Sequence, residues 1–132
     1  MADLIFKLIN LAKEFSQKHT VSIYELLQKT SYLKVADQIS EQDLYKGLAI
    51  HPDFISDWLE YSEDKRTDDG WYFKLSDRNK YLVGSVNESG ITETEYNDKI
   101  EACAVFVKKE LDLIACAMHS KGNMHIKGNS PG

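Results

Sequence analysis

Apolar residues recur every three or four positions through the first half of the chain, a spacing that is typical of amphipathic helices. Serine, threonine and proline residues that favour helix starts divide this half into separate segments. The pattern predicts helices over residues 2–17, around residues 23–27, and over residues 40–50 and 52–64. Thr20 or Ser22 would cap the second of these helices, and Ser40 would cap the third.

The helix predicted over residues 52–64 has one apolar side and one acidic side. At about 100° per residue, its apolar side collects Phe54, Ile55, Trp58, Leu59 and Tyr61. The opposite side collects carboxylates at spacings of four, three and four residues, namely Asp53, Asp57, Glu60 and Asp64. We therefore expect the helix to bury its apolar side and to present a single acidic stripe.

After Gly70 the apolar period changes from about 3.6 residues to 2, which indicates β-strands. Strands are predicted over residues 71–75, 81–86 and 91–96, joined by short polar loops. Loops this short cannot cross over to a parallel neighbour, so the strands should form an antiparallel meander. A long helix over about residues 97–118 follows, with an apolar core stripe on one side. Its charged residues are expected to be mostly exposed: Lys108, Lys109, Glu110 and Asp112.

Together these elements predict a single α+β domain over residues 1–118, made of N-terminal helices, a three-stranded antiparallel β-meander and a long C-terminal helix. Residues 119–132 are expected to form a flexible polar tail. Of the 132 residues, 42% are hydrophobic and 28% are charged, which suffices for one core and excludes a disordered chain. No apolar run approaches the roughly 20 residues that a membrane span requires. A count of two cysteines fits a reducing compartment, so we expect a cytoplasmic protein.

The negative charge of the chain is concentrated in one region. Residues 53–69 contain seven acidic and two basic residues, whereas the rest of the chain carries equal numbers of each sign. Such a region is either a solvated helix face or a docking face for a basic partner. The second hypothesis names six carboxylates and two aromatic anchors: Asp53, Asp57, Glu60, Asp64, Asp68, Asp69, Tyr61 and Trp71.

Recognisable catalytic chemistry is missing from the sequence. Cys103 and Cys116 are 13 residues apart on one predicted helix, so they do not form a cysteine pair with the spacing of a metal site. Both cysteines are expected to be small buried hydrophobes, and we expect neither a metal nor a cofactor. With only two arginines, Arg66 and Arg78, the chain lacks the clustered positive charge that nucleic-acid binding needs.

Four runs of sequence, residues 58–66, 69–73, 81–84 and 100–110, resemble a family of small bacterial cytosolic proteins. Some members look like immunity proteins encoded beside polymorphic toxins, including those of contact-dependent growth inhibition systems. The resemblance covers about residues 57–114, and its shared positions are largely aromatic and small core residues. It implies a non-enzymatic inhibitor that binds a cognate toxin domain. A nuclease is the expected toxin, because nuclease active sites are usually basic.

Two other classes of function remain open from the sequence. One is a small hydrolase or transferase with a spatially assembled site around His51, Asp53 and Tyr81, which requires a concave pocket there. The other is a subunit of a larger assembly, or a dimer formed through the edge strand of the meander. Of the oligomeric states, we expect a monomer in isolation.

Overall fold

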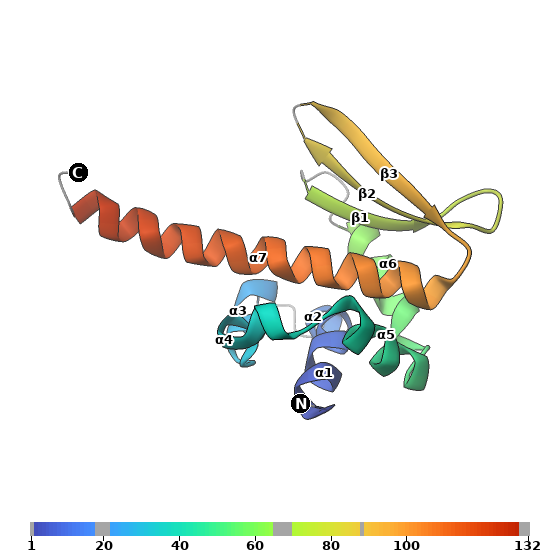
Figure 1. Cartoon of the computed structure of the whole chain (residues 1–132), viewed down its shortest axis with the longest axis horizontal. Helices are drawn as coiled ribbons and strands as arrows, with labels where there is room; N and C mark the ends of the chain where they lie inside the picture. Colours follow the sequence, from blue (N-terminus) through green and yellow to red (C-terminus); the bar gives the residue numbers. More distant parts are fainter. Residues whose placement is uncertain (1, 18–21, 65–69, 88, 130–132) are drawn as a thin grey trace.

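The chain folds into short helices, then a small sheet, then one long helix (Figure 1). The computed structural model describes residues 2–17, 22–64, 70–87 and 89–129. Its first half contains α1 (Ala2–Ile9), α2 (Leu11–Gln17), α3 (Ile23–Gln28), α4 (Tyr32–Val35), the 3₁₀ helix η1 (Ala36–Gln38), α5 (Glu41–Ile50) and α6 (Phe54–Asp64). Its second half contains β1 (Gly70–Leu75), β2 (Tyr81–Asn87), β3 (Gly90–Tyr96) and α7 (Lys99–Asn129). The predicted α+β class and order of elements are confirmed.

The sheet is an antiparallel meander in the order β1-β2-β3. Phe73 on β1 lies opposite Val83 on β2, and Val83 lies opposite Thr94 on β3. Phe73 and Val83 are buried, and the ring of Phe73 stacks on Phe106 of α7 with 5.7 Å between the ring centroids. The inner aromatic residues of the sheet therefore pack against α7.

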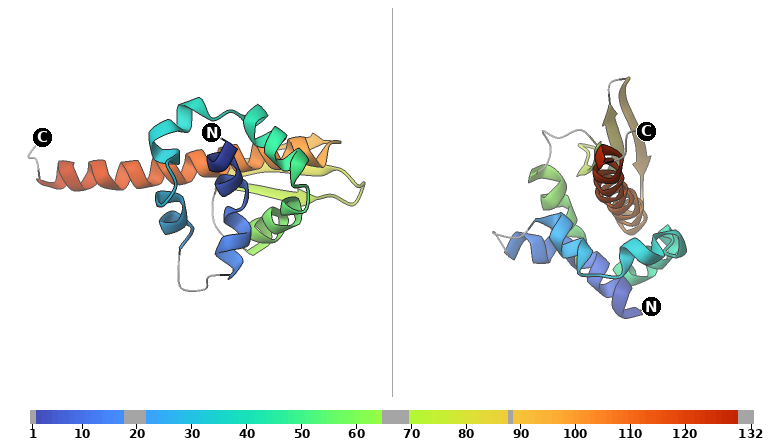
Figure 2. Two further views of the ribbon diagram at one scale, coloured as in Figure 1. Left: turned by 90° about the horizontal axis from the view of Figure 1, so that it is seen from below. Right: turned by 90° about the vertical axis from the view of Figure 1, so that its left-hand side faces the viewer.

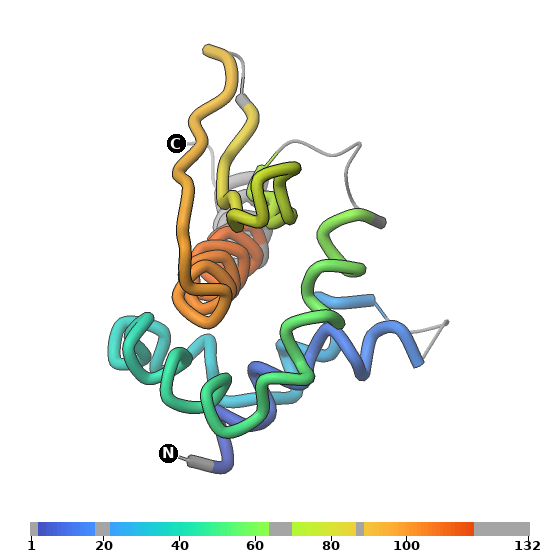
Figure 3. Tube along the Cα trace, turned by 90° about the vertical axis from the view of Figure 1, so that its right-hand side faces the viewer, coloured from blue at the N-terminus to red at the C-terminus, as the bar shows by residue number. Residues whose placement is uncertain are grey.

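Helix α7 lies between the sheet and the N-terminal helices (Figure 1). The sheet packs on one side of α7 and α5 packs on the other, while α6 contacts both α2 and β1. Two further views show the N-terminal helices lying across α7 and the hairpin of β2 and β3 extending away from them (Figures 2 and 3). No helix in the described ranges combines the length and the apolar character that a membrane span needs.

The first predicted helix is interrupted at Asn10, so residues 2–17 form α1 and α2 instead of one helix. At this break the backbone carbonyl of Ile9 accepts a hydrogen bond from the indole Nε1 of Trp58, at 2.8 Å. A side chain that takes a carbonyl from the helical ladder is a common cause of a helix kink. The interruption therefore follows from a contact between residues 49 positions apart.

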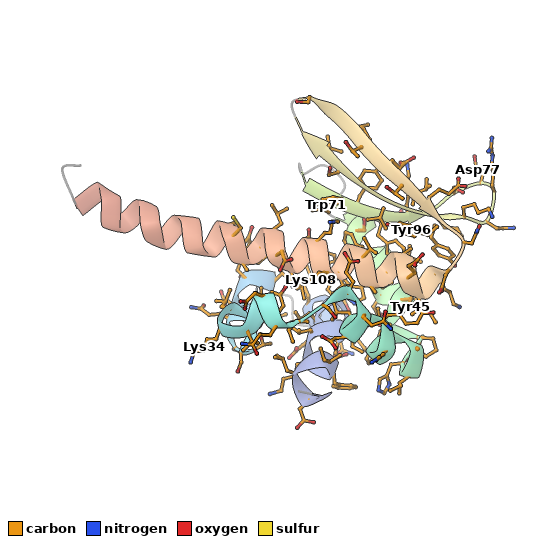
Figure 4. All side chains as sticks on the ribbon, viewed as in Figure 1. Lys34, Tyr45, Trp71, Asp77, Tyr96 and Lys108 are labelled. Carbon is orange, nitrogen blue, oxygen red and sulfur yellow. The ribbon has the colours of Figure 1, made fainter. Side chains whose placement is uncertain are left out.

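The short elements α4 and η1, which the pattern did not predict, are fixed to α7 by Lys108 (Figure 4). The Nζ of Lys108 donates to the carbonyl of Ala36 at 2.6 Å and to the hydroxyl of Tyr32 at 2.9 Å. Tyr32 is fully buried, and its hydroxyl donates to the carboxylate of Asp112. Lys108 was expected to be exposed, but it is half-buried, because its amine bonds to α4 and η1 from its position on α7.

Helix α7 continues to Asn129, beyond the end predicted at residue 118. Two glycines, at positions 122 and 128, lie inside this longer helix. A glycine costs a helix about 1 kcal/mol relative to alanine but does not forbid it. The backbone of α7 extends past α3 and α4 in both views that show it from the side (Figures 1 and 2).

The start of α5 carries a capping box. Ser40 Oγ accepts a hydrogen bond from the backbone of Asp43 at 3.1 Å, and Asp43 Oδ2 accepts one from the backbone of Ser40 at 3.0 Å. The second bond holds the pKa of Asp43 below its usual value. This predicted helix start is confirmed.

We expect Ser40→Ala to lower the free energy of unfolding by about 1 kcal/mol near neutral pH and by less in acid, since the Ser40 hydroxyl caps the helix and also donates to Asp43 Oδ2, which helps to lower the pKa of that carboxyl. Asp43→Ala should lower the free energy of unfolding near neutral pH but not in acid. A carboxyl group whose pKa is lower in the folded state stabilises above its unfolded pKa of about 4, and this contribution disappears as the pH falls through the folded value. Urea denaturation of the Ser40→Ala and Asp43→Ala variants, from neutral pH to below about pH 4, tests both expectations. An Asp43→Ala cost that persists in acid would contradict the assignment.

Candidate functional site

Helix α6 places its carboxylates on the side that faces away from the core. Its apolar residues are buried, as predicted: Phe54, Ile55, Trp58 and Tyr61, with Leu59 half-buried. Asp53, which directly precedes the helix, and Glu60 are exposed, and Asp57 between them is half-buried. We call Asp53, Asp57 and Glu60 the acidic stripe. Asp64 ends α6, but its side chain lies outside the described part of the chain, as do Asp68 and Asp69.

The acidic stripe is not neutralised by ion pairs. Among the described residues, no lysine or arginine lies within 4 Å of its carboxylates. Partial burial raises the pKa of Asp57, and the negative charge of Asp53 raises it further, while the positive charge of Lys13 opposes both effects. The stripe therefore keeps a negative potential, and Lys13 is the positive charge that opposes it at Asp57.

An apolar patch adjoins the start of the stripe. Phe6 of α1 is 42% exposed and Ile50 of α5 is 73% exposed. The ring of Phe6 contacts the ring of His51 edge-on, at 5.1 Å between centroids, and His51 stacks on Phe54 at 5.4 Å. This patch was not predicted, because the exposure of Phe6 depends on how α1 packs against α5. The patch is close to Asp53 in the chain, since Asp53 lies between His51 and Phe54.

A groove of about 660 Å³ lies on the other side of α6, between that helix and the sheet. Its walls include Leu59 and Glu63 of α6 and Trp71 and Tyr72 of β1. Glu63 follows Glu60 by three residues, so the two side chains are neighbours on the helix surface. The groove therefore adjoins the acidic stripe, because Glu63 in its wall is next to Glu60 of the stripe on the helix surface.

The two predicted aromatic anchors lie in different surroundings. Trp71 is half-buried and is one of the residues that line the groove (Figure 4). The Nζ of Lys109 on α7 lies 5.1 Å from the centroid of its ring. Tyr61 is only 7% exposed, and its hydroxyl donates to Glu110 Oε2 at 2.6 Å. Tyr61 is thus a core residue and offers no anchor on the surface.

Two further expectations about α7 were wrong. Glu110 is 2% exposed instead of solvated, because it lies on the same side of α7 as Cys103 and Val107 and its carboxylate accepts the hydroxyl of Tyr61. Cys116 is exposed, whereas Cys103 is buried as expected. Burial raises the pKa of the Cys103 thiol well above its usual value, which makes it a poor nucleophile.

The residues of the alternative catalytic site lie outside this groove. Neither His51 nor Asp53 nor Tyr81 lines the groove. His51 is held between the rings of Phe6 and Phe54, and Tyr81 lies on β2 close to Phe73. In the described ranges, no group of three histidine, cysteine or carboxylate residues is placed to hold a metal ion.

Comparisons of the chain with protein-family models, with curated proteins and with solved structures find no match.

Proposed function

We propose that this chain is a non-enzymatic inhibitor that binds a basic protein domain through the acidic stripe of α6. The observation that carries the proposal is the pairing of carboxylates that have no ion-pair partner among the described residues with the exposed side chains of Phe6 and Ile50. Interfaces combine these two elements, because charge speeds and orients the encounter while buried apolar anchors supply affinity.

The partner proposed is a toxin domain, and the resemblance over residues 57–114 to bacterial immunity proteins supports this choice. A nuclease fits best among toxins, since its substrate phosphates require a positively charged active site. Carboxylates held on a helix can occupy the positions of those phosphates. The inhibitor would then act in the cytoplasm, where the toxin meets nucleic acid.

We expect the free chain to be a monomer. Strand β3 is the open edge of the sheet, and six of its seven residues are exposed. Pairing of two copies of β3 in antiparallel register would bring glutamates 93 and 95 of the two strands together, and like charges across a strand pair are destabilising. Light scattering of the purified protein measures this state directly.

The proposed function is tested by co-expressing the chain with the polypeptide encoded immediately upstream of its gene. We expect that polypeptide to be toxic alone, to be tolerated with the chain, and to purify with it as a one-to-one complex. A neighbour that is harmless alone, or that stays toxic in the presence of the chain, would contradict the proposal.

Charge reversal in the acidic stripe should weaken this complex. In the double variant Asp53→Lys/Glu60→Lys, both exposed carboxylates are replaced by cations, and we expect the dissociation constant to rise at least about tenfold. The matched control Glu25→Lys/Asp37→Lys makes the same change in net charge at exposed positions on α3 and η1. Calorimetric titration compares the two. Equal losses of affinity would show that only total charge matters and that α6 is not the docking face.

A further inference from the structure

One wall of the groove between α6 and the sheet already holds a cation. The Nζ of Lys74 lies 5.4 Å from the centroid of the Tyr72 ring and 4.0 Å from Glu93 Oε1. The hydroxyl of Tyr72 donates to the same carboxylate at 2.5 Å. An aromatic face beside a carboxylate is a general arrangement for binding a positively charged group.

Lys74 is held there weakly. Its side chain is 59% exposed, and an exposed ion pair contributes little to stability because water screens it. Lys108 shows the contrast: its side chain is 16% exposed, and its amine donates to Tyr32, to the carbonyl of Ala36 and to Asp112. A group with three acceptors stays in place, whereas Lys74 can be displaced.

We propose that this groove binds an arginine side chain of the partner, and that Lys74 occupies the position of that side chain in the free protein. The groove offers the flat ring of Tyr72 together with the carboxylate of Glu93, to which the Tyr72 hydroxyl is bonded. A guanidinium group is planar, so it stacks on aromatic rings and forms paired hydrogen bonds to a carboxylate, which an ammonium group cannot do. Arginine is therefore the better occupant, and it displaces Lys74 into solvent.

The inference rests on the proposed function, because a basic partner supplies the arginine. It extends that proposal by giving the partner two points of contact on α6. Positive surface would lie along Asp53, Asp57 and Glu60, and one arginine would enter the groove beyond Glu63. The adjacency of Glu60 and Glu63 makes these two contacts continuous.

The test uses the isolated protein and N-acetyl-arginine amide as the probe. In an NMR titration the backbone amide signal of Tyr72 reports on the groove, because this residue lines it beside Glu93. Trp58 is fully buried and bonded to Ile9, so its indole N–H signal serves as the internal control. We expect a saturable shift of the Tyr72 signal with a millimolar dissociation constant and no shift of the Trp58 signal. N-acetyl-glycine amide, which has no cation, should move neither signal.

Variants define the binding group. Glu93→Gln should weaken binding of the probe by at least about threefold, and Lys74→Gln should strengthen it by a similar factor. Lys80→Gln makes the same change in net charge outside the groove walls and should leave binding unchanged. Shifts that do not saturate, that occur equally at Trp58, or that Lys80→Gln changes as much as Lys74→Gln would overturn the inference.

The two proposals can fail separately. The arginine titration needs no partner, so a negative result removes the groove proposal even if reversal at Asp53 and Glu60 abolishes the complex. A positive titration together with a neighbour that never binds would leave a cation-binding groove and remove the inhibitor function.

Discussion

Replacing Trp58 with alanine is expected to lower the free energy of unfolding by about 3–5 kcal/mol, the range for deleting a fully buried large aromatic side chain. Trp58 is completely buried, and its ring contacts those of Tyr61 and Phe106 at centroid distances of 5.3 and 6.0 Å. Alanine would leave a cavity between α6 and α7. It would also leave the carbonyl of Ile9 without the indole N–H at the break between α1 and α2.

A second variant separates these two effects. Trp58→Phe keeps an aromatic ring but removes the N–H donor, so its cost should be clearly smaller, near 1–3 kcal/mol. Urea denaturation followed by circular dichroism measures both variants without relying on tryptophan fluorescence, which the substitution itself changes. A loss below about 1 kcal/mol for Trp58→Ala would mean that α6 is not anchored to the core through this residue.

Gly84→Ala is expected to lower the free energy of unfolding by about 1–3 kcal/mol, as overpacking generally does. Gly84 lies between Tyr72 and Glu93 on neighbouring strands, and the phenol of Tyr72 crosses over it to reach Glu93. A methyl group at position 84 would lie 2.5 Å from the carbonyl oxygen of Thr92 and would also collide with the Tyr72 hydroxyl. The Tyr72 side chain could rotate away, but the Thr92 carbonyl is part of the backbone, so the strand itself would have to shift.

The contribution of the Tyr72 ring is found from a double-mutant cycle. Tyr72→Ala removes the side-chain obstacle and leaves Thr92, so Gly84→Ala should cost less in that background than in the wild type. The measurement is again urea denaturation of the two single variants and the double variant. Additive costs, within about 0.5 kcal/mol, would show that the ring does not cover Gly84.

The sequence predicts the sheet well, because its signals are local. The change of period after Gly70 and the short loops determine the strands and their antiparallel order. The start of α5 was equally clear, since Ser40 and Asp43 satisfy each other's backbone within three residues. Where a structure depends on nearby residues, the pattern along the chain suffices.

The departures arise where distant residues meet. The carbonyl of Ile9 is taken by Trp58, and the position of Glu110 on the apolar side of α7 is tolerated because Tyr61 donates to its carboxylate. The helical spacing of Glu110 indicates burial, whereas its charge indicates exposure. Which of the two occurs depends on whether a hydrogen-bond donor is present inside the fold, and the sequence alone does not show that donor. The site divides in the same manner. The acidic stripe was predicted because it depends on helical spacing alone, whereas the groove was not predicted because it forms only when α6 packs against β1.

The central claim is that the acidic stripe, and not the total charge, brings the partner to the protein. The most direct measurement is the association rate constant of the complex as a function of salt concentration. We expect a steep decrease with salt for the wild type and for Glu25→Lys/Asp37→Lys, and a slow, nearly salt-independent association for Asp53→Lys/Glu60→Lys. The same rates and the same salt dependence in all three proteins would contradict the claim.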